Sequence, residues 1–451
     1  MFNVCILTRT ECKKNSDTRV LKEASTLRQA GYDIRIIAYQ GISGKPYEEI
    51  DGFRIFRVKL GMVWLKYLRK LIPSQPSESY KVGADNNGAQ NREFNSRKQG
   101  IVFLAKSILS RFVTSILGLM RAIASYFCYL VYYYQSFMLL RKEPVDIYHA
   151  HDLMTLPVAW LAKTIRKGKV VYDCHELWLD RNRQPKRSRI NRFLIRNIEA
   201  FLIRRVDAVI TVSQSIADVL SERYHIPKPT VIINAPYYSP VQRSDILRNE
   251  IGIPAESKII LYIGAITFNR GLEELFQSFK YLSNCSLVLM GYGDADYISN
   301  LRRLISEEKL TDRVHFFGPV PYEEVPRYAA SADMGAAPIK NACLSYYYCS
   351  PNKVFECVAA GLPVVGSNFP DLKRVIEGYR LGVTFDPESP QDIARAIQYV
   401  LSDEARYDEM RNNALEAAKI YNWQNESKKL LVVYERLMGK NKNEIRFEST
   451  A

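Results

Sequence analysis

Residues 350–361 (SPNKVFECVAAG) place an ammonium group and a carboxylate within a short predicted helix. Ser350 fits the N-cap position and Pro351 fits the first helical turn. Lys353 and Glu356 stand three positions apart, so they share one helical face. The free N–H groups and the positive dipole end of a helix attract phosphate oxygens. The pair could therefore hold a diphosphate and a ribose diol; the alternative is an exposed ion pair worth ~0.3 kcal/mol.

A second cationic loop follows the apolar stretch 259–263 (IILYI) and reads GAITFNRG. Gly264 opens this loop at the carboxyl end of the predicted strand, where open α/β sheets bind their ligands. Glycine permits a close approach of the backbone to such a ligand. The planar guanidinium of Arg270 matches phosphate oxygens. The loop predicts a further phosphate contact, although an arginine close to a helix start is common.

Three of the five histidines lie at the ends of two strand-like segments, DIYHAHD and VYDCHE. His149 and His151 are two positions apart and point to the same side of an extended chain. They could belong to a metal site, but no third ligand stands at a zinc-like spacing. We favour hydrogen bonds between these histidines and a sugar or phosphate in a cleft between domains.

The elements that must position these side chains alternate between strands and helices. Residues 3–39 read as strand, helix and strand, which is a βαβ unit of a parallel sheet. The same alternation returns over 145–233, and it begins again at residue 259 after a linker at 234–239 that contains two prolines. The fold class is therefore α/β, with two consecutive domains built on parallel sheets and a cleft between them.

The predicted boundaries follow this pattern. An N-terminal domain covers 1–238 and contains a basic, turn-rich and partly mobile insertion at about 61–142. A C-terminal domain covers 239–425. The last segment, 426–451, is expected to form a helix that packs back on the N-terminal domain and then a tail.

Composition and charge narrow the class of protein. Hydrophobic residues make up 47% and charged residues 25%, which excludes a disordered or collagen-like chain. Residues 1–240 hold 38 Lys and Arg against 20 Asp and Glu, a net charge of +18, and the remainder has a net charge of −3. Such asymmetry suggests an anionic partner: a membrane surface, nucleic acid or a phosphorylated substrate. The alternative is a solvated basic surface without a partner.

Cysteine spacing and the first residues indicate a cytosolic chain. The eight cysteines contain no C-x-x-C pair, and residues 1–9 lack the basic and apolar regions of a signal peptide. Residues 122–140 carry no charge and could just span a bilayer. Their five tyrosines favour an interfacial or partly buried helix instead.

Taken together, these segments resemble the family 4 retaining glycosyltransferases, whose GT-B fold has two facing Rossmann-like domains. The resemblance covers roughly residues 1–60 and 143–435. It rests on an ordered series of motifs: DTRVLKEASTLRQAGYDIRIIA, DIYHAHD, YDCHE, VDAVITVSQSIADVL, IINAP, YIGAITFNRGLEEL, GYGD, VHFFGPVP and SPNKVFECVAAGLPVVGS. Each motif is moderately specific, and their order and spacing make coincidence improbable.

The resemblance implies roles for the residues singled out above. Arg270 and Lys353 would neutralise the diphosphate of a nucleotide-sugar, and Glu356 would accept hydrogen bonds from its ribose. His175 would contact the sugar near its reacting carbon, and Gly264 would let the loop approach the cleft. His175, Arg270 and Lys353 are therefore the expected catalytic residues. The residues expected on the acceptor side are Arg19, His151 and Asp152.

The chain departs from the family pattern at two positions. The family's pair of glutamates eight positions apart keeps only Glu356, because Tyr348 stands at the earlier position. The arginine that usually follows the loop glycine is Ala265, which leaves Arg270 as the basic residue of that loop. Asn352 and nearby backbone N–H groups are expected to replace the missing carboxylate.

The implied reaction transfers a glycosyl group from a nucleotide diphosphate sugar to an acceptor hydroxyl with retention of configuration. Fixed cations that stabilise the departing diphosphate should be the largest catalytic contribution. The sequence shows no enzymatic nucleophile, and no metal or other cofactor is expected. The alternatives are a GT-B sugar-nucleotide epimerase and a noncatalytic membrane-associated binding module. A nucleic-acid partner is not expected, since no recognition motif accompanies the positive charge.

Two basic segments suggest where the enzyme works. Residues 186–205 (KRSRINRFLIRNIEAFLIRR) form a predicted basic amphipathic helix, and residues 60–142 hold 12 Lys and Arg against 3 Asp and Glu. Both suit an anionic membrane surface. We therefore expect a cytoplasmic, peripheral protein at the inner face of the cell membrane, with a lipid-linked or saccharide acceptor. The alternative for the helix is that it packs on the sheet with its basic side in water.

Overall fold

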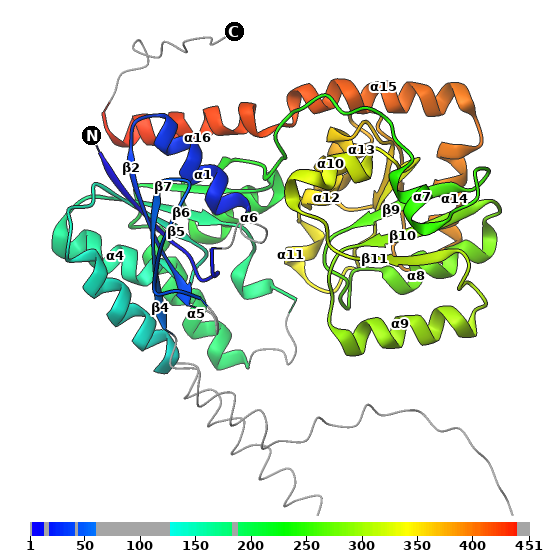
Figure 1. Ribbon diagram of the computed structural model, residues 1–451. Coiled ribbons are helices and arrows are strands. Elements are labelled where there is room, and N and C mark those ends of the chain that lie inside the picture. Colours follow the sequence, from blue (N-terminus) through cyan, green and yellow to red (C-terminus); the bar gives the residue numbers. More distant parts are fainter. Residues whose placement is uncertain (1, 13–17, 41–43, 60–126, 183–187, 440–451) are drawn as a thin grey trace, which may run out of the picture.

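The computed structural model describes residues 2–12, 18–40, 44–59, 127–182 and 188–439. These residues form two α/β domains that lie side by side (Figure 1). Most of the predicted insertion at 61–142 lies outside the described residues, and residues 127–140 of it form a helix. The two-domain α/β architecture predicted from the sequence is confirmed.

The N-terminal domain is built on an eight-stranded sheet with the order β3-β4-β2-β1-β5-β6-β7-β8. Neighbouring strands are parallel except β3 and β4, which form an antiparallel pair at one edge. The strands are β1 (Asn3–Leu7), β2 (Asp33–Gln40), β3 (Tyr47–Ile50), β4 (Phe53–Lys59), β5 (Ile147–His151), β6 (Lys169–Cys174), β7 (Ala208–Thr211) and β8 (Thr230–Val231). The parallel strands bring the residues that follow β1, β5 and β6 to one edge of the sheet.

Helices cover both faces of this sheet. They are α1 (Thr18–Gln29), α4 (Leu156–Arg166), α5 (Arg189–Ile203) and α6 (Gln214–Tyr224), with a short 3-10 helix η1 (Trp178–Asp180). The hydroxyl of Ser188 accepts from Asn191 N at the start of α5, and that of Ser213 accepts from Ile216 N at the start of α6. These side-chain caps explain why the two helices begin where they do.

The C-terminal domain has a fully parallel six-stranded sheet with the order β11-β10-β9-β12-β13-β14. Its strands are β9 (Lys258–Ile263), β10 (Cys285–Met290), β11 (Val314–Phe317), β12 (Met334–Ala337), β13 (Val364–Ser367) and β14 (Thr384–Phe385). Its helices are α7 (Ile246–Ile251), α8 (Leu272–Ser278), η2 (Phe279–Tyr281), α9 (Ala295–Glu307), η3 (Tyr322–Glu324), α10 (Val325–Ala329), α11 (Leu344–Tyr347), α12 (Asn352–Ala359), α13 (Pro370–Ile376), α14 (Pro390–Leu401) and α15 (Glu404–Ile420).

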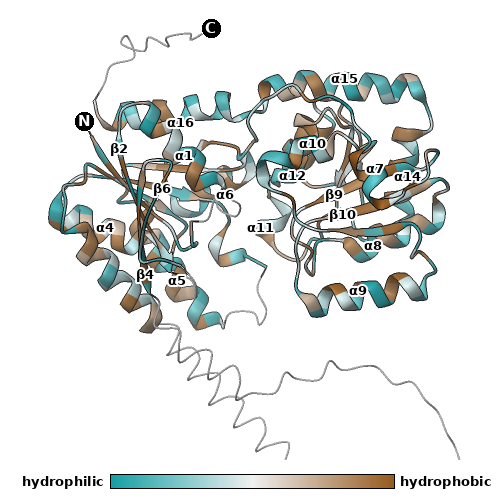
Figure 2. Ribbon diagram, viewed as in Figure 1, coloured by the Kyte–Doolittle hydropathy of each residue, from teal (hydrophilic) through white to brown (hydrophobic). Residues whose placement is uncertain are grey.

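The central strands of this second sheet are apolar along their whole length, because helices cover both sheet faces. Every residue of β10 (CSLVLM) is buried, and five of the six residues of β9 are buried. Figure 2 shows the hydrophobic colour on these strands. A rigid, dry sheet of this kind fixes the positions of the loops at its carboxyl edge.

Helix α16 (Trp423–Leu437) returns the chain from the C-terminal domain to the N-terminal domain, where it lies next to α1 (Figure 1). Trp423 is 1% exposed; its indole N–H donates to Thr26 Oγ1 (3.0 Å) and its backbone N–H donates to Pro236 O (2.8 Å). Glu426 accepts from the backbone N–H of Ile233 (2.8 Å). The first turn of α16 is therefore bound both to α1 and to the linker between the domains.

The helix that carries Lys353 starts later than the sequence suggested. The predicted first helical residue, Pro351, is the N-cap and is extended (φ −74°, ψ 132°), so α12 begins at Asn352. Ser350 therefore does not cap this helix as predicted, and no side-chain hydrogen bond caps it. Asn352 occupies the first turn. The free backbone N–H groups of that turn donate no hydrogen bond to the N-cap side chain.

Helix α5 packs on its own domain with part of its apolar surface. Leu202 and Ile203 are buried in the core of the N-terminal domain, and Ile195 packs against that core. A second apolar stripe at helical spacing is exposed: Ile190 74%, Phe193 66%, Leu194 52%, Ile198 50% and Phe201 44%. The alternative in which this helix packs on the sheet therefore holds for one side of the helix and leaves the second stripe uncovered by the described residues.

We predict that Trp423→Ala lowers the free energy of unfolding by ~3–5 kcal/mol, because it removes a large buried side chain and the partner of Thr26. Urea unfolding followed by circular dichroism measures the change. Tyr292→Ala, which truncates a side chain that is 66% exposed, is the matched control and should change stability by less than ~0.5 kcal/mol. Equal stability of the two variants would show that α16 does not anchor the N-terminal domain.

Candidate active site

A cavity of about 480 Å³ lies between the two domains at the carboxyl edges of both sheets. Its walls come from both domains, so the predicted interdomain cleft is present. All the site residues predicted from the sequence line this one cavity. They are Arg19, His151, Asp152, His175, Gly264, Arg270, Asn352, Lys353 and Glu356. Their chemical roles stay predictions.

The C-terminal domain presents two cations to this cavity. Arg270 stacks on the ring of Tyr346, with 4.6 Å between its Cζ and the ring centroid. Lys353 Nζ lies 3.6 Å from the centroid of Tyr262. Within the described residues neither cation forms an ion pair, and Lys353 Nζ has no hydrogen-bond partner although the residue is 7% exposed. An unpaired ammonium in a closed site is costly unless an anion neutralises it.

The pKa of Lys353 reflects this arrangement. Burial lowers it well below the ordinary lysine value, and the nearby charge of Arg270 lowers it further. A diphosphate bound between Lys353 and Arg270 would reverse both effects, because it supplies the missing counter-charge. The two side chains therefore form a site that gains its full positive charge when an anion enters.

Gly264 opens the loop between β9 and α8 with φ +121°, a value that disfavours other residues. The loop returns to the cavity edge at Arg270. Gly291, at the end of the next strand, leaves room for this turn, since a Cβ on it would lie 2.0 Å from the carbonyl oxygen of Gly264. The glycines thus let the loop follow the sheet edge closely and hold Arg270 beside the cavity.

The N-terminal domain contributes a buried cluster of charged side chains beneath the cavity. Arg19 donates from Nε and Nη2 to the two oxygens of Asp173 (2.8 and 3.0 Å) and from Nη1 to Ile232 O (2.8 Å). His175 Nε2 lies 2.8 Å from Asp173 Oδ2, and His151 Nδ1 lies 3.1 Å from the same His175 nitrogen. Although Arg19 lines the cavity, its guanidinium is largely occupied by protein groups.

Burial and neighbouring charges move the pKa values of this cluster in different directions. Burial lowers the pKa of His151 to about 3, so this ring is neutral. Burial alone would also lower the pKa of His175, but the carboxylates of Asp173 and Asp152 raise it to about 9. Burial raises the pKa of Glu23 to about 7, against the opposing effect of Arg19. The result is a protonated imidazole at the cavity edge above a neutral one.

The four residues Glu23, His149, His151 and Asp173 have the composition of a metal site. One possible ligand atom from each lies within 4.8 Å of the others, and among the described residues only this group has that property. Arg19, however, forms ion pairs with both carboxylates (3.0 Å to Glu23, 2.8 Å to Asp173). A divalent cation would add two positive charges beside a guanidinium in a dry site, which is unfavourable. We assign the cluster to charge pairing with Arg19; both oxygens of Glu23 and the Nε2 atoms of His149 and His151 have no hydrogen-bond partner among the described residues.

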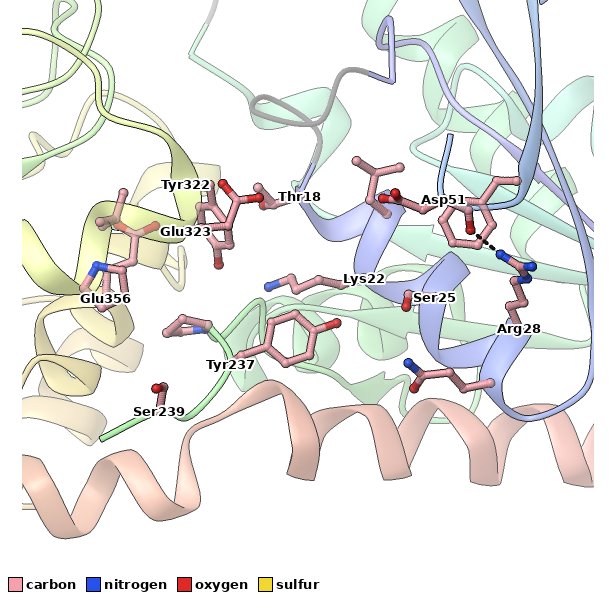
Figure 3. A pocket seen from close by; sticks show the side chains of 16 residues that line it. Thr18, Lys22, Ser25, Arg28, Asp51, Tyr237, Ser239, Tyr322, Glu323 and Glu356 are labelled. Carbon is pink, nitrogen blue, oxygen red and sulfur yellow. Dashed lines mark hydrogen bonds between the residues drawn. The ribbon is translucent and has the colours of Figure 1, made fainter. Parts of the chain in front are cut away.

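Glu356 stands where this cavity meets a second one. The second cavity, of about 700 Å³, shares Thr18 and Glu356 with the first and runs along one face of α1 (Figure 3). Burial raises the pKa of Glu356 to about 7, against the effect of two nearby lysines, Lys22 and Lys353. The tyrosines Tyr237 and Tyr322 give the second cavity flat aromatic walls.

Lys22 is a site residue that the sequence did not reveal. Its ammonium donates to Ala235 O (2.6 Å) and lies 4.9 Å from the ring centroid of Trp423. Burial lowers its pKa to about 7, and Arg19 lowers it further. Asp173 and Glu23 were missed as well. The i, i+4 spacing of Arg19 and Glu23 was the available signal, but it is common on solvated helices.

The position that lacks the family's glutamate does not reach the cavity. Tyr348 ends α11, and its carbonyl accepts from the hydroxyl of Ser213 (2.7 Å) across the domain boundary. Tyr346, two positions earlier, lines the cavity and supports Arg270. Asn352 and Ala265 line it too. That Asn352 replaces the missing carboxylate stays a prediction.

Comparisons with known proteins agree with this geometry. Residues 243–418 match the family described as "Glycosyl transferases group 1", and residues 114–235 match "Glycosyltransferase Family 4". An uncharacterized glycosyltransferase of Methanocaldococcus jannaschii is 28% identical over 315 residues, which cover 66% of this chain and 77% of that protein.

Solved structures share the fold across nearly the whole chain. Sucrose-phosphate synthase from Thermosynechococcus elongatus has a TM-score of 0.73 at 16% identity and covers 98% of this chain and 100% of its own. Anabaena HepE, solved with UDP-glucose, has a TM-score of 0.65 at 14% identity and covers 97% and 100%. The first match lies in the C-terminal domain, and the second lies in the N-terminal domain apart from residues 114–126, which are outside the described residues. The chain therefore belongs to the family 4 glycosyltransferases and has the GT-B fold.

Proposed function

We propose that this glycosyltransferase moves a sugar from a nucleotide diphosphate sugar to an acceptor hydroxyl and retains the anomeric configuration. The observation that carries the proposal is a pair of cations, Arg270 and Lys353, that line one interdomain cavity and form no ion pair within the described residues. Two such positive charges in one cavity suit a diphosphate, which is the leaving group of such donors. HepE, which has the same fold, was solved with UDP-glucose, and this supports a donor of that class.

In this proposal the diphosphate and sugar of the donor occupy the first cavity, the ribose lies at the junction, and the base occupies the second cavity. The diphosphate lies between Arg270 and Lys353, beside the first turn of α12. The ribose hydroxyls donate to Glu356, which stands at the junction of the cavities. The base then enters the second cavity between aromatic walls (Figure 3), and the sugar points back toward His175.

The reaction breaks the bond between the anomeric carbon and the diphosphate oxygen. The acceptor oxygen attacks from the same face, and its proton passes to the departing phosphate oxygen. Arg270 and Lys353 stabilise the negative charge that develops on this leaving group. Since these two cations supply that charge, the proposal needs no metal ion. His151 and Asp152 line the opposite wall, where the acceptor approaches.

The acceptor in this proposal is a lipid-linked saccharide at an anionic membrane, as in surface polysaccharide assembly. The helix α5 that bears the exposed apolar stripe also carries Arg189, Arg192 and Arg196, and Arg205 follows just beyond its C-terminal end. The helix at 127–140 exposes further apolar residues, among them Phe127 (61%) and Leu130 (63%). An apolar stripe bordered by arginines matches acyl chains below anionic headgroups.

No helix among the described residues combines the length and hydrophobicity needed to cross a bilayer. Attachment in this proposal is therefore peripheral, at the inner face of the cell membrane.

The function is tested by incubating the purified protein with UDP-, GDP- and dTDP-sugars, with and without a membrane extract, in the presence of EDTA. We expect nucleotide release from one donor that depends on the extract. Lys353→Ala should lower turnover at least about a hundredfold, since one such donor contributes ~3–4 kcal/mol. Lys428→Ala, at an exposed lysine of α16, is the control. Turnover of a donor without any acceptor would instead favour the epimerase, and no turnover the binding module.

Binding of inorganic pyrophosphate should take up protons from the buffer. Burial and the charge of Arg270 lower the pKa of Lys353, and a bound anion opposes both effects and raises this pKa, so the side chain takes up protons on binding. Glu356, whose pKa is already raised to about 7, shifts further in the same direction. Calorimetry at pH 8 in two buffers of different ionisation enthalpy measures the uptake. Equal binding enthalpies in both buffers, or an unchanged uptake in Lys353→Met, would contradict the assignment.

Flotation with anionic liposomes at low salt tests the membrane surface. The protein should float with the vesicles, and a double variant with Ile190→Ser and Phe193→Ser should float at least about tenfold less, because the apolar stripe is interrupted. Pyrophosphate binding should be the same in both proteins. Tyr292→Ser, which alters an equally exposed aromatic on the other domain, should float like the unaltered protein. Flotation of the double variant at the normal level would show that α5 does not bind the membrane.

A further inference from the structure

We infer that Asp173 is the positioning residue that holds the ring of His175 as a fixed imidazolium at the active-site cavity. In this arrangement His175 donates a hydrogen bond to an oxygen of the bound donor and does not act as a general base. The inference deepens the proposed function, on which the contact between His175 and the donor rests. The geometry of the buried cluster supports it in four steps.

The first step concerns the carboxylate of Asp173. It is 0% exposed, and Arg19 holds both its oxygens at 2.8 and 3.0 Å. This bidentate contact with a guanidinium fixes the plane of the carboxylate and keeps it ionised. Burial would raise the pKa of Asp173, but Arg19 and His175 hold it well below its usual range. Asp173 is therefore a fixed negative charge at the end of β6.

The second step concerns the imidazole nitrogen that faces Asp173. His175 Nε2 lies 2.8 Å from Asp173 Oδ2 and 3.1 Å from His151 Nδ1. Since the carboxylate can only accept, Nε2 carries a hydrogen. His151 is neutral, and its Nδ1 accepts from the same hydrogen. The proton of His151 is then on Nε2, which lies 3.2 Å from Glu23 Oε2. The protein thus fully occupies one side of the His175 ring.

The four side chains of this group differ in how much of their surface is exposed. The side chain of His175 is 26% exposed, whereas those of Asp173 and Glu23 are 0% exposed and that of His151 is 2% exposed. His175 is thus the member of this group with the most surface open to a ligand. Because Nε2 is occupied, Nδ1 is the nitrogen that remains for the donor.

The fourth step is the balance of charge in this dry region. The charged and titratable groups around His175 come from several elements: Asp173 from β6, His149 and His151 from β5, Asp152 from the loop after it, Arg19 and Glu23 from α1, Tyr434 from α16, and Arg9, Glu176, Arg270 and Lys353 on the cavity wall. At a pH above about 7, which is the raised pKa of Glu23, Arg19 and a protonated His175 balance ionised Asp173 and Glu23 in the buried group. A neutral His175 would then leave a net negative charge away from solvent, which is unfavourable.

The protonation of His175 determines which group takes the acceptor's proton. An imidazole that carries a hydrogen on both nitrogens cannot accept the acceptor's proton, so the departing phosphate must take it. The imidazolium instead adds a third positive charge to those of Arg270 and Lys353 on the cavity wall. It is suited to a sugar hydroxyl or a phosphate oxygen, and not to the anomeric carbon, where positive charge develops.

The first measurement needs no variant. Histidine-selective ¹⁵N labelling of the full-length protein gives signals from five side chains, and His175→Gln identifies that of His175. We expect the ring to titrate near pH 9, because Asp173 and Asp152 raise its pKa. A ring that titrates near the ordinary value of ~6.5 would overturn the inference, whether or not the protein turns over a nucleotide-sugar.

The second measurement is the pH dependence of kcat/KM. A raised pKa means that the active imidazolium persists up to about pH 9 and is lost above it. In Asp173→Asn the descending limb should move down by at least one pH unit toward neutral pH, and activity at pH 8 should fall at least about tenfold. Asp173→Glu, which keeps the charge, should recover part of the profile.

Asp207→Asn supplies the matched control. Asp207 also pairs with a cation, Lys163 (2.6 Å), and accepts from the backbone of β6, but it lies outside this cavity. This variant should lose stability without moving the descending limb. An Asp173→Asn profile with the same descending limb as the unaltered enzyme would show that Asp173 has a structural role alone. If Asp173→Asn does not fold, the titration of His175 in the unaltered protein decides the question.

Discussion

The structure depends on one constraint: two cations of the C-terminal domain line the interdomain cavity and neither forms an ion pair with a carboxylate of the described residues. Lys353 has no hydrogen-bond acceptor within those residues, and the charge of Arg270 opposes its own more than the nearby carboxylate of Glu356 favours it. Folding tolerates this because both side chains lie on aromatic rings, those of Tyr262 and Tyr346, whose faces attract cations. The unfavourable electrostatics that remain are relieved by an anionic ligand. The site is thus prepared for a charge that the protein itself does not contain.

The N-terminal domain solves the opposite problem. Its buried carboxylates are paired with a cation: Arg19 forms ion pairs with Asp173 and Glu23, and Asp173 and His151 both contact His175. Arg19 and Asp173 are held in place because each makes several of these contacts, whereas both oxygens of Glu23 have no hydrogen-bond partner among the described residues. The cleft therefore has one wall that lacks a counter-charge and one wall that is internally balanced. A donor that brings a diphosphate completes the first wall without disturbing the second.

Helix α16 and the linker hold the two walls of the cavity in fixed positions relative to each other. Trp423 contacts the linker through Pro236 and α1 through Thr26, and Lys22 on α1 reaches the carbonyl of Ala235 in the same linker. On the other side of the cleft, Asp371 of the C-terminal domain accepts from the first backbone N–H groups of α6. Contacts on both sides of the cavity thus hold the domains facing each other. The exposed stripe of α5 lies on the N-terminal domain, so the membrane attachment proposed for it does not involve the C-terminal domain.

The sequence by itself determined the α/β class, the two domains and the cavity-lining side chains. Strand and helix periodicities are local, and in parallel sheets every strand end is brought to the same edge, so residues such as His175, Gly264 and Lys353 could be placed from their position after a strand or in a helix. The start of α12 was missed by one residue because Pro351 is equally compatible with a cap and with a first turn.

Only the tertiary structure decided which charges are paired. Arg19 was expected to face an acceptor, yet Asp173, from a strand 154 residues away, occupies its guanidinium. Glu23 and Lys22 read as ordinary residues of a solvated helix until α16 and the linker bury them. In the opposite direction, the apolar residues of α5 read equally well as core and as surface, and the packing left them exposed. The burial of a side chain and the charge that pairs with it depend on segments that are distant in the sequence. A local pattern of residues therefore contains neither.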